Sequence, residues 1–276
     1  MQRWSTILLL MIPLAFTVLG ESWAQRWRRQ REEFFDPTDR RGVPMWEQDE
    51  HFGNDVFTFV RIRYDSGWGR GWGGGGWATD FPDSDLNFPY RLQQLTSMRV
   101  NPQYKVLDLT DPELLDYPFV YLIEPGRMTL SEPEVRGLRR YLLNGGFMMV
   151  DDFWGEDEWD NLYAELKRVF PDREPQELPL EHPIFHCVYD LKEKPQVPSI
   201  HTWLSSGRTY ERWDAQEPHY RALFDDNGRM MAIICHNTDL GDGWEREGEH
   251  EEYFREFSEK KAYPMGINVV VYAMTH

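Results

Sequence analysis

The sequence predicts an α/β protein with a mostly parallel sheet that is covered by helices on both faces. Three observations indicate this class. Short apolar segments alternate with amphipathic helical patterns along most of the chain. Two of these segments, FVYLI and FMMV, are apolar throughout, as buried parallel strands are. The composition is 41% hydrophobic and 15% aromatic, with twelve Trp, which supplies enough apolar surface for one substantial core.

The first predicted strand and helix lie between residues 56 and 97. The segment VFTFVRIRY begins at Val56, and its alternation of apolar and basic residues predicts a strand. The helix follows as DSDLNFPYRLQQLTS, and we expect Asp83 or Ser84 to be its N-cap.

Three more strands follow, in the segments YKVLDL, PFVYLIE and FMMVDDF. A helix is expected between the last two of them. Ser131 with Glu134 three residues later is the pattern of a capping box, which opens a helix. Gly145 and Gly146 are expected to end it.

The second half of the chain predicts fewer regular elements. A helix is expected over residues 156–170, ended by Pro171, and then a proline-rich excursion with short elements over residues 171–218. YRALFDDNGRMMAIIC predicts a hairpin around the turn at residues 226–228. A charged helix over about 248–261 and the apolar segment GINVVVYAM complete the chain.

The amino-terminal segment predicts export. Residues 1–24 hold Arg3, an apolar run from residue 7 to residue 19 and the small residues Ser22 and Ala24, a pattern typical of a cleaved signal peptide. We therefore expect a periplasmic or secreted protein with a polar linker or surface arm over 25–54 and a single domain over 55–276. Four arginines between residues 26 and 31 favour the alternative, an uncleaved form kept in the membrane.

The net charge of the protein restricts the kinds of molecule that it can bind. Thirty Lys and Arg against 47 Asp and Glu give a net charge of -17, which excludes a basic nucleic-acid binder. Residues 151–181 and 239–261 are especially acidic, and we expect solvent-exposed helix faces there. The alternative is an electronegative surface for a basic partner, as in a structural envelope protein.

The cysteines and histidines give weak signals for chemistry. Cys187 and Cys235 either form a disulfide, which export would permit, or stay free and buried. Cys235 and His236 are neighbours on a strand, so their side chains point to opposite faces and cannot form a catalytic pair. His182 and His186 are four residues apart, but Pro183 disfavours a helical metal site and a structural role is expected.

Acidic and polar residues gather just after the predicted strands, where open α/β sheets bind their ligands. They are Asp80, Asp83, Asp85, Glu124, Asp151, Asp152, His236, Asn237 and Asp239. We expect a carboxylate-rich cleft that holds Ca²⁺ or Mg²⁺ through Asp80, Asp151 and Asp152, or that binds sugar hydroxyls with Trp77, Trp154 or Trp244. The competing interpretation is structural: Asp83 and Asp85 would cap a helix, and Asp151 and Asp152 would form a turn.

The glycine-rich segment GWGRGWGGGG over residues 67–76 follows the first strand. Gly69, Gly71 and Gly74 match a dinucleotide-binding spacing, but the helix begins too late and the acidic residue that should follow a second strand is missing. We expect instead a flap over the strand ends, with Trp68, Trp72 and Trp77 as contact residues.

The ordered elements resemble a bacterial family known as domain of unknown function 4159. The resemblance is carried by FTFVRIRY, WATDFPDSDLNFPYRLQQLTS, YPFVYLIEPGRMTLSEPEVRGLRRYLLNGGFMMVDDFWG, LEHPIFH, NTDLGDGWE and MGINVVVYAMTH. The middle stretch is also similar to the class I glutamine amidotransferase-like superfamily, which implies a three-layer, flavodoxin-like fold. It implies no amidotransferase activity, because Asp151, Asp152 and Phe153 stand where that superfamily has its cysteine elbow.

Together these observations predict an exported, non-amidotransferase α/β domain that binds a ligand or an envelope partner at its strand ends. One alternative is a metal-assisted hydrolase acting on a carbohydrate or cell-envelope substrate. Another is a structural envelope protein. A divalent cation is the expected cofactor in the first alternative, and the sequence holds no complete catalytic triad.

Overall fold

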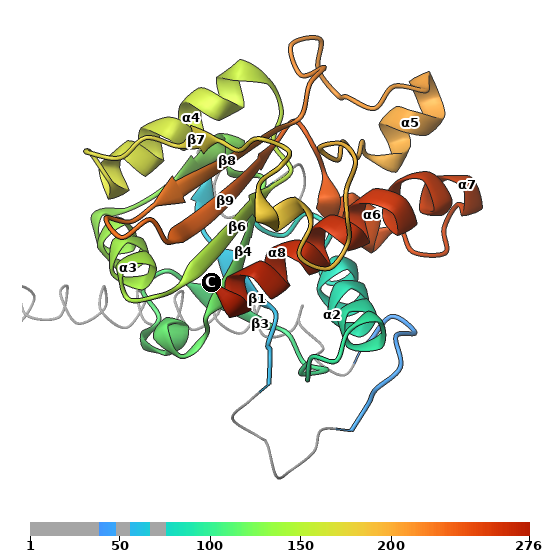
Figure 1. Ribbon diagram of the computed structural model, residues 1–276, viewed down its shortest axis with the longest axis horizontal. Helices are drawn as coiled ribbons and strands as arrows, with labels where there is room; N and C mark the ends of the chain where they lie inside the picture. The colour runs from blue at the N-terminus through green and yellow to red at the C-terminus, as the bar shows by residue number, and fades with distance from the viewer. Residues whose placement is uncertain (1–38, 48–55, 67–75) are drawn as a thin grey trace, which may run out of the picture. The chain divides into compact units, whose positions relative to one another are not determined.

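The computed structural model describes residues 39–47, 56–66 and 76–276 (Figure 1). The predicted signal peptide over 1–24 and most of the glycine-rich segment, residues 67–75, lie outside the described residues. The chain divides into two compact units, residues 1–42 and 43–276. The second unit carries the α/β domain.

Five strands form the parallel part of the sheet. They are β1 (Val60–Arg63), β3 (Lys105–Asp108), β4 (Phe119–Ile123), β6 (Phe147–Asp151) and β9 (Met230–His236). Their spatial order is β3-β1-β4-β6-β9, which is the flavodoxin order 2-1-3-4-5. The register pairs Val60 with Lys105 and Val120 with Met148. The predicted three-layer, mostly parallel fold is therefore confirmed, although the first strand is shorter than expected.

Two antiparallel strands extend this sheet beyond β9. β8 (His219–Phe224) pairs with β9, and β7 (Gln176–Glu177) pairs with β8, which gives a seven-stranded sheet within the described residues. The hairpin between β8 and β9 turns at residues 225–229 as predicted, with Gly228 in the left-handed region at φ 80°. A small second sheet pairs β2 (Asp65–Ser66) with β5 (Met128–Thr129).

Helices cover both faces of the sheet (Figure 1). One face packs on α3 (Glu132–Leu143) and α4 (Gly155–Val169), through residues such as Leu138, Leu142, Leu162 and Leu166. The other face packs on α2 (Asp83–Leu95), α6 (Leu240–Glu245) and α8 (Tyr263–Thr275). The predicted capping box opens α3, because the Glu134 carboxylate accepts a hydrogen bond from the Ser131 N–H at 2.8 Å.

The N-cap expected for the first helix is wrong. Pro82 occupies the cap position of α2 without a side-chain cap, so Asp83 and Ser84 are already helical. The charged segment expected as one helix near residues 248–261 is α7 (Glu251–Tyr253) followed by a π-helical stretch, η5 (Phe254–Ala262). The final apolar segment is the helix α8.

Short elements fill the remaining connections. The excursion over residues 171–218 contains η4 (Pro183–Phe185) and α5 (Ile200–Ser206), as expected, and η2 (Pro112–Asp116) and η3 (Pro125–Arg127) lie on either side of β4. The described part of the arm contains Trp46, whose indole N–H donates to the Val100 carbonyl at 2.7 Å. None of the described helices is long and apolar enough to cross a bilayer.

Both cysteines are free, so the disulfide that export would permit is not formed. Cys235 is buried in β9, and burial raises the pKa of its thiol well above the usual value. His182 accepts a hydrogen bond from the Ile184 N–H at 3.2 Å, and His186 lies 2.7 Å from an Asp190 oxygen. Both histidines therefore have the structural surroundings that were expected.

Candidate metal centre

The candidate site lies at the carboxyl ends of the parallel strands. The strand order reverses between β1 and β4, and in open α/β sheets the ligand crevice forms at such a point. Glu124 follows β4, Asp152 follows β6 and Asn237 follows β9, each with a positive φ between 49° and 63°. Asp80 precedes α2 with φ 60°. Such left-handed backbones are strained for residues other than glycine and concentrate at functional sites.

Arg61 fixes the loop that carries Asp80. Its guanidinium is fully buried, and its Nη1 donates to the carbonyls of Trp77 and Thr79 at 2.9 and 2.8 Å. The remaining donors contact Ser84 and Asp85, with Nη2 2.5 Å from Asp85 Oδ2. Asp85 is thus the partner of Arg61 in a buried ion pair, and it is not among the carboxylates that could hold a metal ion.

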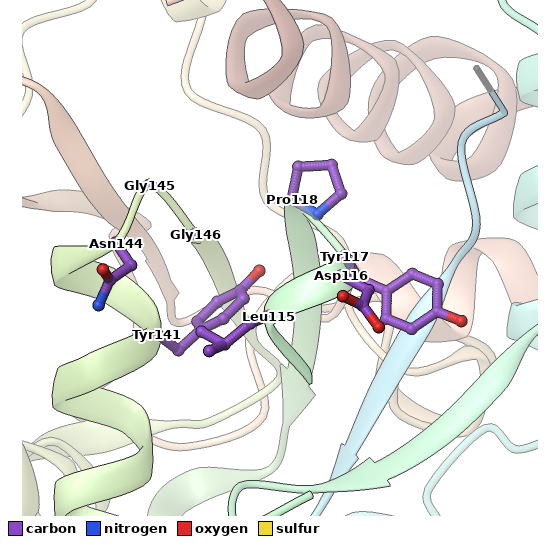
Figure 2. A pocket seen from close by; sticks show the side chains of 8 residues that line it. All are labelled: Leu115, Asp116, Tyr117, Pro118, Tyr141, Asn144, Gly145 and Gly146. Atoms are coloured by element: carbon purple, nitrogen blue, oxygen red, sulfur yellow. The ribbon is translucent and has the colours of Figure 1, made fainter. Parts of the chain in front are cut away.

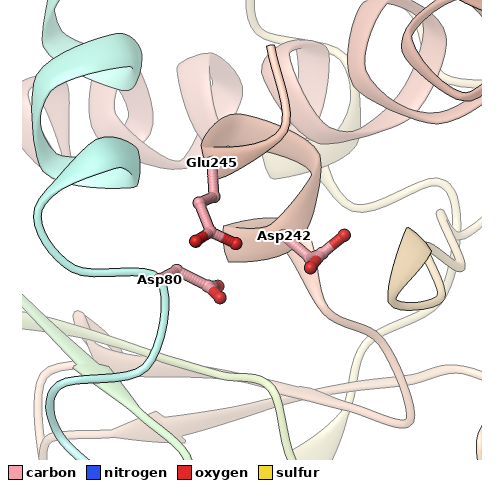
Figure 3. Close-up of side chains that lie close together, drawn as sticks. All are labelled: Asp80, Asp242 and Glu245. Atoms are coloured by element: carbon pink, nitrogen blue, oxygen red, sulfur yellow. The ribbon is translucent and has the colours of Figure 1, made fainter. Parts of the chain in front are cut away.

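Five carboxylates meet beside this loop in two sets of three. Asp80, Asp152 and Asp239 each offer an oxygen within 4.8 Å of the other two. Asp80, Asp242 and Glu245 do the same. Figure 3 shows the second set, in which Asp80 faces Glu245 and Asp242 lies beside them on α6. Sequence segments 160 residues apart therefore supply one acidic cluster.

Hydrogen bonds orient several of these carboxylates. The Trp154 indole donates to Asp152 Oδ1 at 3.0 Å, and Asp239 accepts the Asp242 N–H at 2.7 Å as the N-cap of α6. Asp242 Oδ2 accepts the Ile200 N–H and the Tyr253 hydroxyl, at 2.9 and 2.8 Å. Each of these bonds engages one oxygen of a carboxylate, so the other oxygen can serve as a ligand.

The cluster has few positive neighbours. Arg246 Nε lies 2.8 Å from Glu245 and 3.4 Å from Asp242. Among the described residues, no Lys or Arg forms an ion pair with Asp80, Asp152 or Asp239. Arg61 acts on Asp80 only from beyond ion-pair distance, and it lowers the pKa of Asp80 less than burial and the neighbouring carboxylates raise it.

Burial and mutual repulsion raise the pKa values in the cluster. Burial is the largest cause for Asp80, Asp152 and Asp239, and neighbouring carboxylates add to it, so all three pKa values lie well above normal. The pKa of Glu245 is raised to about 7 by the same causes. These groups therefore gain free energy from a bound proton or a bound cation.

Three buried oxygens in this region have no hydrogen-bond partner: Asp80 Oδ2, Asp151 Oδ1 and Glu245 Oε2. The other oxygen of Asp151 accepts the Tyr121 hydroxyl at 2.9 Å and the Gly241 N–H at 3.0 Å. A Cβ on Gly241 would lie 2.4 Å from Asp80 Oδ2, so only glycine permits this approach. Gly241 thus brings Asp80 and Asp151 to one point of the backbone.

The comparison with protein families bears on these residues. The family model described as "Domain of unknown function (DUF4159)" matches residues 58–274, which include the whole cluster. The chain belongs to the DUF4159 family. The comparison with curated proteins gives no match.

The DUF4159 domain unites only some of the side chains expected at the cleft. Asp80, Asp152 and Asp239 come together, and Glu124 is near enough to raise the pKa of Asp152. Asp151 lies next to these residues but outside both sets of candidate metal-ligating residues, and its role as a ligand stays a prediction.

His236 and Asn237 are not part of the acidic cluster. His236 Nε2 lies 3.0 Å from the Gly155 carbonyl, and its ring stacks on Phe153 and Trp159. Asn237 accepts the Gly155 N–H at 2.9 Å and donates to the Glu217 carbonyl. Both residues join β9 to the start of α4, and their role in ligand binding stays a prediction.

The three tryptophans expected to contact a ligand have different surroundings. Trp244 is fully buried and packs on Phe88 with ring centroids 4.3 Å apart. Trp154 is buried and supports Asp152, and Trp77 is partly buried with its carbonyl bonded to Arg61. The structure therefore assigns Trp154 and Trp244 to support and packing rather than to a free contact surface.

A shallow pocket of about 190 Å³ lies elsewhere (Figure 2). It is lined by Leu115, Asp116, Tyr117, Pro118, Tyr141, Asn144, Gly145 and Gly146. Pro118 and Gly146 immediately precede β4 and β6, so this pocket opens at the amino ends of the strands. It is therefore at the opposite edge of the sheet from the acidic cluster.

Sequence reasoning missed Asp242 and Glu245. The acidic segment after residue 239 was expected to be a solvent-exposed face, whereas Asp239 and Asp242 are buried. The signal that could have found them is local: Asp239, Asp242 and Glu245 are spaced three apart, which places them on one side of a helix.

Proposed function

We propose that the DUF4159 domain binds a divalent cation at the carboxyl edge of its sheet, and that the cation helps to hold an oxygen-rich ligand. The observation that carries the proposal is the set formed by Asp80, Asp152 and Asp239, whose ligand oxygens lie within 4.8 Å of one another. All three residues come from strand-end loops, where α/β domains bind ligands.

The spacing suits a hard cation with long bonds. Ca²⁺ binds oxygens at about 2.3–2.6 Å, so two oxygens on opposite sides of one ion are about 5 Å apart. Mg²⁺ binds at about 2.0–2.1 Å and needs a tighter site. The donors are carboxylates only, which favours Ca²⁺, Mn²⁺ or Mg²⁺ over zinc or copper. The carboxylates would have to move less to bind Ca²⁺ or Mn²⁺ than to bind Mg²⁺.

The charge balance supports the same proposal. Without a cation, the carboxyls must keep protons that they would lose in water at neutral pH. A divalent cation replaces those protons and removes the repulsion among three buried negative charges. Binding should therefore stabilise the fold strongly near neutral pH.

A carbohydrate or an envelope partner remains our proposed ligand class, and Trp213 supports it. This side chain is 83% exposed. Its neighbours dock beside the cluster: Arg212 donates to the Trp154 carbonyl at 3.1 Å, and Asp214 accepts the Glu156 N–H at 3.1 Å. Trp213 therefore projects from a segment anchored just after Asp152, where an exposed aromatic ring can stack on a sugar.

Metal-assisted hydrolysis is the second candidate, and it has its own support. The pKa values of Glu124 and Asp151 are both raised to about 7, chiefly by burial. A carboxyl with such a pKa is suited to act as a general base near neutral pH. The substrate would be a carbohydrate or another cell-envelope component. Glu124→Gln should then abolish Mn²⁺-dependent hydrolysis of chromogenic glycosides or esters.

We further propose that the protein is exported and shares the amidotransferase-like superfamily fold without its activity. The apolar run over residues 7–19 supports export, and the residues at the end of β6, Asp151 and Asp152, support the lack of a nucleophile. Mass measurement of the mature chain from a periplasmic fraction tests export. A mass that includes residues 1–24 contradicts cleavage.

The cation proposal is tested by thermal unfolding of the full chain in EDTA and in saturating Ca²⁺, Mn²⁺ or Mg²⁺. A cation at about 100 times its Kd adds about 2.7 kcal/mol, which raises Tm by about 5–10 °C. Asp239→Asn keeps an N-cap for α6 but removes the charge of one ligand. The cation should therefore raise the Tm of this variant much less than the Tm of the unmodified chain.

Asp116→Asn is the matched control. Asp116 is exposed at the opposite edge of the sheet, and its variant should respond to the cation as the unmodified chain does. The proposal is contradicted if no cation raises Tm, or if Asp239→Asn and the control respond equally to the cation.

A further inference from the structure

We infer that the acidic cluster holds two divalent cations, with the Asp80 carboxylate shared between them. This inference rests on the proposed cation binding and extends it from one ion to a pair. The two sets of ligand residues have Asp80 as their common member: Asp152 and Asp239 complete one set, and Asp242 and Glu245 complete the other.

The carboxylates divide into two sets because the oxygens bound to one ion can be only a limited distance apart. Oxygens bound to the same Ca²⁺ are at most about 5 Å apart, because each bond is about 2.3–2.6 Å. Within each set of three carboxylates, the ligand oxygens all lie within 4.8 Å of one another. The five carboxylates taken together do not meet this condition. One ion therefore cannot use all five ligands without a rearrangement, whereas two ions can.

Unpartnered oxygens give an independent reason to expect ions here. Buried polar atoms in proteins almost always have a hydrogen-bond partner. Asp80 Oδ2 is buried without one, and so is Asp151 Oδ1, whose side chain is 0% exposed. Both residues contact Gly241, so both orphaned oxygens belong to the same region. A cation bound to Asp80 Oδ2 would satisfy that atom.

The position of Asp80 suits a shared ligand. Its backbone is held in the left-handed region at φ 60°, and its loop is fixed by the hydrogen bonds from Arg61 to the Trp77 and Thr79 carbonyls. It is placed between α6, which carries Asp242 and Glu245, and the strand ends that carry Asp152 and Asp239. Sites with two metal ions commonly bind both ions through a common carboxylate or water.

The charges on the two sides differ in a way that predicts unequal affinity. Arg246 contacts both Asp242 and Glu245, whereas Asp152 and Asp239 form no ion pair within the described part of the chain. A nearby guanidinium repels a cation. The Asp152 and Asp239 side should therefore fill first, and the Glu245 side should fill at higher cation concentration.

The test is the number of Mn²⁺ ions bound by the full chain, measured by equilibrium dialysis with elemental analysis. We expect two ions for the unmodified chain and for the Asp116→Asn control. Asp239→Asn and Glu245→Gln should each retain one ion. Asp80→Asn, which keeps a residue that tolerates a positive φ, should retain none. Electron paramagnetic resonance should show coupled Mn²⁺ spins only when two ions are bound.

The possible results separate this inference from the proposed function. If the unmodified chain binds one ion and Asp239→Asn binds none, the inference of two ions is wrong, but the proposed cation site is supported. If Asp80→Asn still binds two ions, Asp80 is not the ligand that the two ions share. No bound ion in the unmodified chain overturns both. Circular dichroism of each variant in EDTA shows whether the chain is folded, so that loss of an ion can be distinguished from unfolding of the variant.

Discussion

Arg61 and Asp85 form a buried ion pair directly beneath the loop that carries Asp80. Both side chains are 0% exposed, and the closest atoms, Arg61 Nη2 and Asp85 Oδ2, are 2.5 Å apart. Arg61 Nε also donates to Asp85. Arg61 uses its remaining donors on Ser84 and on two loop carbonyls, so it forms its ion pair with Asp85 and not with a carboxylate of the acidic cluster.

Breaking this pair should destabilise the domain strongly. Asp85→Ala leaves the Arg61 charge buried and uncompensated, a change that costs about 3–5 kcal/mol. Asp108→Ala is the matched control, because its partner Arg63 is 25% exposed and can be hydrated. Urea unfolding monitored by tryptophan fluorescence measures both. A cost for Asp85→Ala no larger than that of the control contradicts the structural role of the pair.

Asp152→Asn should have opposite effects with and without a cation. In EDTA it replaces a carboxyl whose ionisation is opposed by burial and by neighbouring carboxylates, while the amide oxygen can still accept from the Trp154 indole. We expect the Tm in EDTA to rise by several degrees and the cation-induced increase to be largely lost. Thermal unfolding under both conditions measures this. A lower Tm in EDTA would show that the charge does not oppose folding.

The stability of the cation-free domain should fall as pH rises from about 4 to about 7. The pKa values of Glu124, Asp151 and Glu245 are raised to about 7 in the folded chain, so these groups hold protons that the unfolded chain has already released. Each then binds more protons folded than unfolded, and the free energy of unfolding decreases with pH.

A saturating cation should abolish that fall and release protons on binding near pH 7. Calorimetric titration with Ca²⁺ in buffers of different ionisation enthalpy measures the release. Glu245→Gln should flatten the pH dependence of the free energy of unfolding measured in EDTA. Stability that rises steadily from pH 4 to 7 without cation would contradict the raised pKa values.

His236 should stay neutral across the physiological range. Burial lowers its pKa to about 4, and its ring is stacked between Phe153 and Trp159. Because the unfolded chain binds the proton at higher pH, this residue alone makes stability fall as pH drops from about 6.5 to about 4. NMR of the imidazole carbons should show no titration between pH 5 and 8. A midpoint near 6.5 would contradict the burial of this ring.

The general architecture was predictable because it depends on local patterns. The apolar segments over β4 and β6, the capping box at Ser131 and the hairpin turn near Gly228 each encode their element within a few residues. Asp80, Asp152 and Asp239 were also predictable as neighbours, since the carboxyl ends of parallel strands meet at one edge.

Side-chain direction was harder to predict from the sequence. Every residue of β9 is buried, so alternation cannot tell on which face His236 lies. Arg61 was expected on an alternating strand, but a loop covers it and its ion-pair partner Asp85 comes from α2. The spacing of Asp242 and Glu245 shows that they share one side of α6, but which segment that side faces depends on the packing of α6 against α2, a contact between distant parts of the chain.

The most direct measurement is anomalous diffraction from crystals of the full chain grown with Mn²⁺. The account predicts anomalous density bound to Asp80 and flanked by Asp152 and Asp239, with a weaker second peak toward Glu245. Crystals of Asp80→Asn under the same conditions should lack both peaks. Well-ordered crystals that show no Mn²⁺ at Asp80, or Mn²⁺ only at exposed surface carboxylates, would contradict the proposed metal centre.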